Sequence, residues 1–271
     1  MDRLGIEFIT ALGQDPADYV HLAADLGVPQ IGLALSPVSL ASPDQPSWSM
    51  RDDAVLYARV KAALIDRQVN VMLGEGFLIH PQMDVANAAR DMDLLAELGT
   101  ARINLVAIDP DVPRYHDQFA LFAAMASERS MAATVEFMPG VAVATLAQAL
   151  DCVVASGCNT AGVLVDSMHF FRSGATPEEL AAVDPALIGH AQICDAPVVP
   201  TIASYADEAR YERLSPGEGE LPLRAFVEAL PRDMFIGLEV PQRSRALAGR
   251  DHHARIGAII AAARGLAAGL L

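Results

Sequence analysis

Short apolar segments alternate with amphipathic segments along nearly the whole of this 271-residue chain. The apolar segments are rich in Val, Ile, Leu and Ala and lack strict polar alternation, as expected of strands buried on both faces. We predict strands at 4–10, 29–36, 69–78, 101–109, 132–138, 160–168, 188–195 and 234–241. Because a segment of helical periodicity follows each strand, the pattern is typical of βαβ units around a parallel sheet.

The intervening segments predict helices, of which the clearest are 15–26, 50–67, 86–98, 114–129 and 144–156. Several end at a glycine that suits a left-handed C-cap, and the last helix follows Asp251, a suitable N-cap. Eight strand–helix pairs predict an α/β fold, a single (β/α)8 TIM barrel, with residues 1–271 as one domain. A doubly wound open sheet is the alternative, although no GxGxxG motif follows the first strand.

Two connections are longer than usual, and both follow predicted strands. The first, 37–49, is rich in Pro and Ser and contains the only tryptophan, Trp48. The second is 196–219. Long loops at one rim of a barrel often form lids or binding walls, so we expect Trp48 to contact substrate. The alternative is that these loops have no functional role, and this alternative applies more to the first connection than to the second.

The composition excludes several classes of function. The formal net charge is −15 and the pI is about 4.7, and such a field repels the phosphate backbone of nucleic acids. No apolar stretch reaches the roughly 18 residues that span a bilayer, and the N-terminus does not resemble a signal peptide. The three cysteines form no CxxC pair. We therefore expect a cytoplasmic protein with reduced thiols and no membrane or nucleic-acid partner.

Polar residues occur near the carboxyl ends of most of the predicted strands. They are Glu75, Glu136, Asp166, Gln192, Asp195 and Glu239. In a barrel these strand ends meet at one face, and an ionised carboxylate in an apolar run is costly unless it is paired. The pattern predicts one divalent metal ion, Mg²⁺, Mn²⁺ or Co²⁺, with Zn²⁺ less favoured. A network of carboxylates paired with Arg and Lys is the alternative.

Five sequence blocks carry a resemblance to a known family. They are VEFMPG, LVDSMHFFRSG, IGHAQICDAP, SPGEGELPL and IGLEVPQ. In their order and spacing they resemble the xylose isomerase-like barrels, often described as sugar phosphate isomerases or epimerases. The resemblance implies that Glu136, Asp166, Gln192 and Glu239 bind one metal ion. Gln192 departs from the commonest pattern, which has His, and its neutral oxygen favours Mg²⁺ or Mn²⁺ over Zn²⁺. His190 is the alternative ligand, although we expect it lower in the barrel.

The same resemblance implies catalytic residues. His169 follows Asp166 by three residues, and the family often uses this histidine to contact substrate or move protons. In the family's epimerases, the two glutamates that correspond to Glu136 and Glu239 act as bases on opposite faces of the substrate. A structural histidine is the alternative for His169.

Three further residues are candidates for binding substrate. Arg172 and Arg213 could each hold a carboxylate or phosphate through a bidentate pair, and an ordinary salt bridge is the alternative for both. Glu75 lies between two glycines, which allows close approach, and we expect it to bind substrate hydroxyls. A purely structural role is the alternative for Glu75.

These residues together predict a metal-dependent isomerase or epimerase. Its substrate would be a small polyhydroxylated carbonyl compound, a sugar or cyclitol, reacting through a metal-stabilised enediolate. The alternative is a dehydratase, because Gln192 is similar to the pattern in bacterial 3-dehydroshikimate dehydratases. A nuclease and a non-catalytic sugar-binding barrel are weaker alternatives. The small-molecule substrate is the expected partner, and the Ala-rich last helix could form a homo-oligomer.

Overall fold

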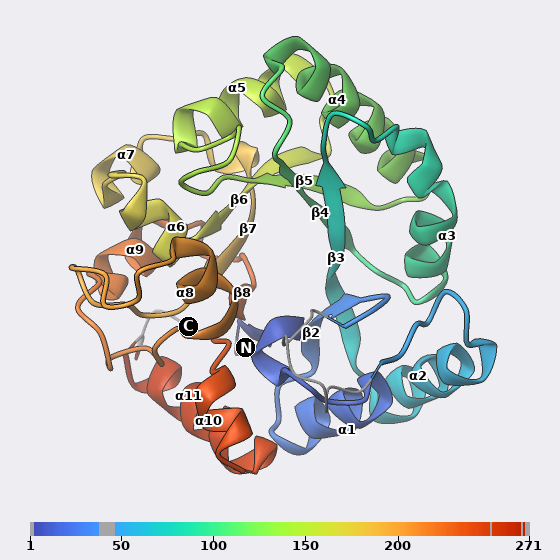
Figure 1. Cartoon of the computed structure of the whole chain (residues 1–271), viewed down its shortest axis with the longest axis vertical. Coiled ribbons are helices and arrows are strands. Elements are labelled where there is room, and N and C mark those ends of the chain that lie inside the picture. Colours follow the sequence, from blue (N-terminus) through green and yellow to red (C-terminus); the bar gives the residue numbers. More distant parts are fainter. Residues whose placement is uncertain (1–2, 38–46, 250, 267, 269–271) are drawn as a thin grey trace.

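Eight parallel strands form a closed barrel in which each strand pairs with its neighbours in sequence and β1 pairs with β8 (Figure 1). The computed structural model describes residues 3–37, 47–249, 251–266 and 268. The strands are β1 Leu4–Ile6, β2 Gln30–Ala34, β3 Asn70–Ile79, β4 Arg102–Ala107, β5 Ala132–Glu136, β6 Ala161–Asp166, β7 Ile188–Ile193 and β8 Ile236–Leu238. The predicted (β/α)8 barrel is confirmed, and the open doubly wound sheet is wrong, because β1 closes the sheet against β8.

The helices form a ring outside the barrel (Figure 1). The longer ones are α1 Pro16–Asp25, α2 Ala54–Arg67, α3 Ala89–Glu97, α4 Val112–Glu128, α5 Leu146–Ser156 and α11 His252–Leu266. The shorter ones are α6 Ser167–Arg172, α7 Pro177–Ala181, α8 Tyr205–Tyr211, α9 Leu223–Ala229 and α10 Arg243–Leu247. Three 3-10 helices, η1 Phe8–Ala11, η2 Val85–Ala88 and η3 Pro185–Leu187, complete the described elements.

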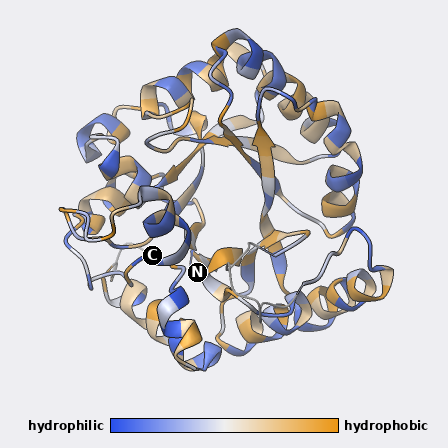
Figure 2. Cartoon of the chain, viewed as in Figure 1, coloured by the Kyte–Doolittle hydropathy of each residue, from blue (hydrophilic) through white to orange (hydrophobic). Residues whose placement is uncertain are grey.

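Amphipathic patterning and capping explain why these segments form helices against the barrel. Polar residues lie mainly on the outer faces of the helices and apolar residues on the strands (Figure 2). Phe119 and Phe122 of α4 are fully buried. Thr145 and Gln148 form a capping box at the start of α5. The side chain of Asp251 accepts a hydrogen bond from the backbone N–H of Ala254, at the start of α11.

Several predicted strand boundaries differ from those of the structure, and the first strand is one of them. The first strand was expected to reach residue 10, but it ends at Ile6 and η1 follows. The cause is Thr10, whose hydroxyl donates to the carbonyl oxygen of Leu238 (2.7 Å) and accepts from the N–H of Val240 (2.8 Å). These bonds hold the chain across the end of β8. The long connection 196–219 contains the short helix α8, and most of the connection 37–49 lies outside the described residues.

Among the described residues, no helix combines the length and apolar character that crossing a bilayer would require.

Candidate active site and metal-binding residues

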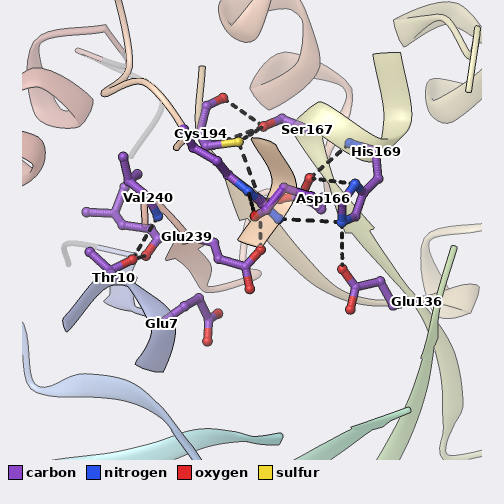
Figure 3. Close-up of polar contacts among 12 residues, drawn as sticks. Glu7, Thr10, Glu136, Asp166, Ser167, His169, Cys194, Glu239 and Val240 are labelled. Carbon is purple, nitrogen blue, oxygen red and sulfur yellow. Dashed lines mark hydrogen bonds and ion pairs between the residues drawn. The ribbon is translucent and has the colours of Figure 1, made fainter. Parts of the chain in front are cut away.

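The carboxyl ends of four consecutive strands bring the predicted metal ligands to one end of the barrel. Glu136 ends β5, Asp166 ends β6, Gln192 lies in β7 and Glu239 follows β8. Asp166 and Gln192 are paired in the β6–β7 register. All four side chains are buried. Figure 3 shows the carboxyl groups of Glu136 and Glu239 pointing toward one central space, which Glu7 of the chain after β1 also faces.

Arg213 lies among these acids. Its Nη1 is 2.7 Å from Oδ2 of Asp166 and 2.7 Å from Oε2 of Glu239. Its Nε donates to the carbonyl oxygen of Ala209 in α8 (2.6 Å), which fixes the direction of the guanidinium. The neighbouring negative charges hold the pKa of Arg213 above its ordinary value, although burial alone would lower it. Arg213 therefore acts as the cation of this cluster in the structure.

The side-chain oxygens of these four residues can be compared with the ligands that the predicted metal ion prefers. Oε1 of Gln192 is buried and has no hydrogen-bond partner in the described part of the chain, so it is a free oxygen donor. Three carboxylates and one amide oxygen are the donors that a hard divalent cation prefers. Within the described ranges, however, no three His, Cys, Asp or Glu side chains form a metal-binding group. The residue types fit a cation, and Arg213 would have to leave Asp166 and Glu239 to admit it.

His169 occupies the wall beside Glu136. Its backbone N–H donates to Oδ1 of Asp166 (2.9 Å), and its Nε2 is 3.4 Å from Oε1 of Glu136. Its Nδ1 contacts the hydroxyl of Tyr205 in α8. Burial lowers the pKa of His169 to about 4, and the charge of Arg213 adds to this effect. The imidazole is therefore neutral at physiological pH.

The carboxyl groups hold more negative charge than Arg213 can balance. Burial, and next the charge of Asp166, raise the pKa of Glu136 to about 7. A hydrogen bond of 2.8 Å from Nδ2 of Asn104 to Oε2 of Glu136 opposes this rise. Burial also raises the pKa of Glu239 well above its ordinary value. A carboxyl group with a pKa near 7 is suited to exchange a proton at neutral pH.

Two further glutamates, the buried Glu7 and the partly buried Glu75, lie in the barrel close to these acids. Oε1 of Glu7 is 2.7 Å from Nε2 of His190, and both side chains are buried. Glycines make room for Glu7, since a Cβ at Gly237 would lie 1.8 Å from Oε1 of Glu7 and one at Gly32 would lie 2.0 Å from Oε2. Burial, and next the charge of Glu7, raise the pKa of Glu75 well above its ordinary value.

Two of the predicted substrate-binding residues have other contacts in the structure. The guanidinium of Arg172 donates to the carbonyl oxygens of Pro197 (2.8 Å) and Val198 (2.7 Å) and to Oε1 of Glu208 (3.1 Å). Arg172 therefore holds the loop after β7 against α8. Trp48 is partly buried and packs edge-on against Phe8, with ring centroids 5.7 Å apart.

A cavity of about 500 Å³ adjoins the site on the side of α8 and α10. Arg213 and Gln242 form its inner wall, and Pro197, Thr201, Glu212 and Arg245 lie around it. Arg213 thus connects the acidic cluster with this cavity.

The xylose isomerase-like TIM barrel family matches residues 3–264 of the chain, which is almost its whole length. The chain belongs to this family. No curated protein sequence is similar enough to this member of the family to count as a match.

Solved structures with the same fold include proteins of several activities. The IOLI protein, described with a bound zinc atom, has a TM-score of 0.81 at 16% identity and covers 100% of this chain and 99% of its own. A D-psicose 3-epimerase has a TM-score of 0.72 at 14% identity, with coverage of 98% and 99%. The probable 3-DHS dehydratase AsbF from Bacillus anthracis has a TM-score of 0.74 at 15% identity, with coverage of 96% and 98%. At these identities the likeness concerns the fold alone.

Sequence reasoning missed three residues of this xylose isomerase-like site. Glu7 was not a candidate, although a charged residue in the apolar run LGIEFIT was a usable signal. Tyr205 and Asn104 contact His169 and Glu136, respectively, and nothing in their sequence surroundings distinguishes them from other polar residues.

Proposed function

We propose that this protein is a divalent-metal-dependent isomerase or epimerase that acts on a small polyhydroxylated carbonyl compound, such as a sugar or cyclitol. The observation that carries the proposal is the group of Glu136, Asp166, Gln192 and Glu239, buried at the ends of four consecutive strands. Membership of the xylose isomerase-like family and the structural likeness to a sugar epimerase support it.

Glu136, Asp166, Gln192 and Glu239 would hold the metal ion, and Mg²⁺, Mn²⁺ or Co²⁺ suits these oxygen donors better than Zn²⁺. Once bound, the ion would supply a Lewis acid that polarises the substrate's carbonyl group. Release of Arg213 from Asp166 and Glu239 would free its guanidinium to donate hydrogen bonds to an oxygen of the substrate.

The chain's own residues would move the proton. Glu136 would take a proton from the carbon next to the carbonyl group. Glu239 lies across the central space, and the raised pKa of its carboxyl group favours the protonated form (Figure 3). It would donate its own proton to the other face of the substrate, which gives epimerisation. The neutral His169, fixed by Tyr205 and Asp166, would accept or donate a hydrogen bond at a substrate hydroxyl.

A dehydratase is the second candidate, and Gln192 is the observation that favours it. The residue at this position resembles the pattern of 3-dehydroshikimate dehydratases, and a probable enzyme of that type shares the fold. The first proton transfer would be the same, and loss of the β-hydroxyl would follow it.

The test begins with the metal content of protein purified without added metal. We expect about one equivalent of divalent metal in the wild type and a strong loss in Glu239→Gln. Glu228→Gln is the matched control, because Glu228 is an exposed residue of α9 whose ion pair, within the described residues, is with Arg224. Since Mg²⁺ can be lost in purification, thermal shift with added Mg²⁺, Mn²⁺ or Co²⁺ accompanies the analysis.

Loaded protein is then assayed with ketoses, inososes and 3-dehydroshikimate. Exchange of the proton next to the carbonyl with solvent deuterium, followed by NMR, detects an epimerase or isomerase. A new conjugated product detects a dehydratase. If no divalent ion binds or stabilises the wild type at millimolar concentration, the metal-dependent function is wrong.

A further inference from the structure

A second cavity, of about 310 Å³, lies between the loop after β7 and the helices after β8. Its polar wall consists of Ser215, Glu218, Gln242, Arg245, Asp251 and Arg255, and alanines of α11 form the rest. None of the proposed metal ligands or catalytic residues belongs to this wall. Gln242 and Arg245 belong to both cavities, so the second adjoins the one that Arg213 lines.

Arg255 is the unusual member of this wall. It lies in α11, and only 5% of its surface is exposed. One nitrogen, Nη2, donates to the carbonyl oxygen of Thr10 (2.8 Å) and lies 3.4 Å from Nδ1 of His252. The other two, Nε and Nη1, are buried and have no hydrogen-bond partner in the parts of the chain that the structure describes.

The charge of Arg255 is also uncompensated. No ion pair joins it to a carboxylate among the described residues, and burial together with the charge of Arg245 lowers its pKa to about 10. A buried guanidinium without a counter-ion, and with two unsatisfied donors, is unfavourable unless an anion supplies the missing acceptors.

The two carboxylates in the wall, Glu218 and Asp251, form hydrogen bonds with groups other than Arg255. Glu218 is paired with Arg245, with N–O distances of 3.1 and 3.0 Å, and also accepts from the N–H of Ser215. Asp251 caps α11 by accepting from the N–H of Ala254. Neither carboxylate therefore neutralises Arg255.

Gln242 is a second buried side chain with unused hydrogen-bonding capacity. It is 2% exposed, its Nε2 donates to Oγ of Ser215 (3.1 Å), and its Oε1 has no partner among the described residues. Because Ser215 can accept or donate, rotation of the amide by half a turn would keep that contact and turn the N–H donors around.

We propose that this cavity binds a small oxyanion, the phosphate or carboxylate group of a metabolite, through Arg255 with Gln242 and Arg245. The loops after strands 7 and 8, which form this wall, are where TIM barrels frequently bind phosphate. The nitrogens of Arg255 are covered in this structure, so the anion enters by displacing a neighbour. The partly exposed Arg245 is the side chain best able to move, and it would turn from Glu218 toward the anion.

Two sources of such an anion are compatible with this chemistry. The group is either the charged end of the substrate, reaching over Gln242 from the cavity beside Arg213, or a separate anion that binds alone. The first source rests on the proposed function, whereas anion binding by Arg255 does not.

The test is calorimetric titration of the wild type with inorganic phosphate, in an amine buffer of constant ionic strength. We expect saturable binding that weakens about tenfold or more in Arg255→Met, since a charge-assisted hydrogen bond is lost. Arg255→Lys should recover part of the affinity. Arg224→Gln removes an equal charge from the exposed face of α9 and should bind phosphate like the wild type. Circular dichroism confirms that each variant is folded.

Two results would overturn the proposal. One is a wild type that binds neither phosphate nor acetate at millimolar concentration. The other is Arg255→Met binding as tightly as the wild type.

A polyol phosphate then distinguishes the two sources. If the anion is the end of the substrate, the polyol phosphate binds more tightly than inorganic phosphate, and Glu239→Gln removes that gain while leaving phosphate binding intact. If the anion binds alone, the polyol adds no affinity. Loss of metal-dependent activity in Glu239→Gln with phosphate binding unchanged separates failure of the catalytic site from failure of this one.

Discussion

Two arginines, Arg213 and Arg255, are almost equally buried, with 4% and 5% of their surfaces exposed, yet their surroundings are opposite. Arg213 contacts two carboxylates at 2.7 Å, and its pKa is held above the ordinary value. Arg255 contacts a backbone carbonyl and a histidine, and its pKa is lowered to about 10. Burial alone therefore does not decide the state of a charge, because the partners that share the site reverse its effect.

The difference also separates two kinds of site. At Arg213 the acidic groups outnumber the cation, and burial together with the neighbouring carboxylates raises the pKa of Glu136 and Glu239. At Arg255 the positive charge is in excess, so the site has capacity for an anion. The two cavities that adjoin these arginines share Gln242, so the proposed metal site and the proposed anion site are neighbours.

The largest expected effect comes from removing the compensated charge. Arg213→Met leaves Asp166 and Glu239 buried without their cation, so we expect the free energy of unfolding of metal-free protein to fall by about 3–5 kcal/mol. Millimolar Mn²⁺ should restore much of the loss, because a bound divalent ion replaces the missing charge. Urea unfolding with and without Mn²⁺ measures both quantities.

Arg224→Gln is the control for this experiment, since Arg224 forms an exposed pair with Glu228 and should change stability by less than about 0.5 kcal/mol. A loss below about 1 kcal/mol in Arg213→Met would mean that the acids of the site are not held by its charge.

The excess of negative charge at Arg213 predicts a pH dependence in metal-free protein. Because the pKa of Glu136 rises from 4.5 to about 7 on folding, the folded protein retains a proton that the unfolded chain releases. This contribution is complete below about pH 4.5 and is lost as the pH rises through 7, with a size on the order of 1–3 kcal/mol. Stability curves of the wild type should therefore fall over this interval relative to Glu136→Gln. Parallel curves for the two proteins would contradict the assignment.

The barrel, and the position of its acidic residues at the carboxyl ends of the strands, could be predicted because both follow from local sequence patterns. The strands β5 to β8 are apolar runs with a polar residue at or next to the carboxyl end, and closure brings these ends to one face. Glu136, Asp166 and Glu239 lie at these positions for that reason. The short first strand could not be predicted, because it depends on bonds between Thr10 and residues of β8 and beyond, 228 and 230 positions away.

The partners of the buried charges were also beyond the sequence. Arg213 was predicted to bind substrate, but its bridge between Asp166 and Glu239 depends on the path of the loop after β7. Arg255 reads as one polar position on an amphipathic helix. Its isolation follows from Glu218 and Asp251 each having another partner, which is a property of the packed molecule.

A third buried ionisable residue, Glu7, can be compared with the two arginines, and a smaller change in stability is expected there. Glu7 is paired with His190, and its neighbours leave no spare room, since a Cβ at Gly237 would lie 1.8 Å from its Oε1. Gly237→Ala should therefore lower the free energy of unfolding by about 1–3 kcal/mol, as overpacking does. Gly265→Ala in α11, where a Cβ meets nothing within 4 Å, should instead be neutral or gain about 1 kcal/mol. Equal effects of the two substitutions in thermal or urea unfolding would show that Glu7 can move freely.

The smallest effect is expected at Arg255, and it is the most direct test of the contrast. Arg255→Met in phosphate-free buffer loses the hydrogen bond to Thr10 but removes an unpaired buried charge, and the two changes oppose each other. We expect the free energy of unfolding to change by no more than about 1 kcal/mol in either direction, against the several kcal/mol expected for Arg213→Met. Urea unfolding of both variants in one buffer provides the comparison. A loss at Arg255 as large as that at Arg213 would mean that Arg255 is already satisfied by the protein itself, and a protein that satisfies it has no need of an anion there.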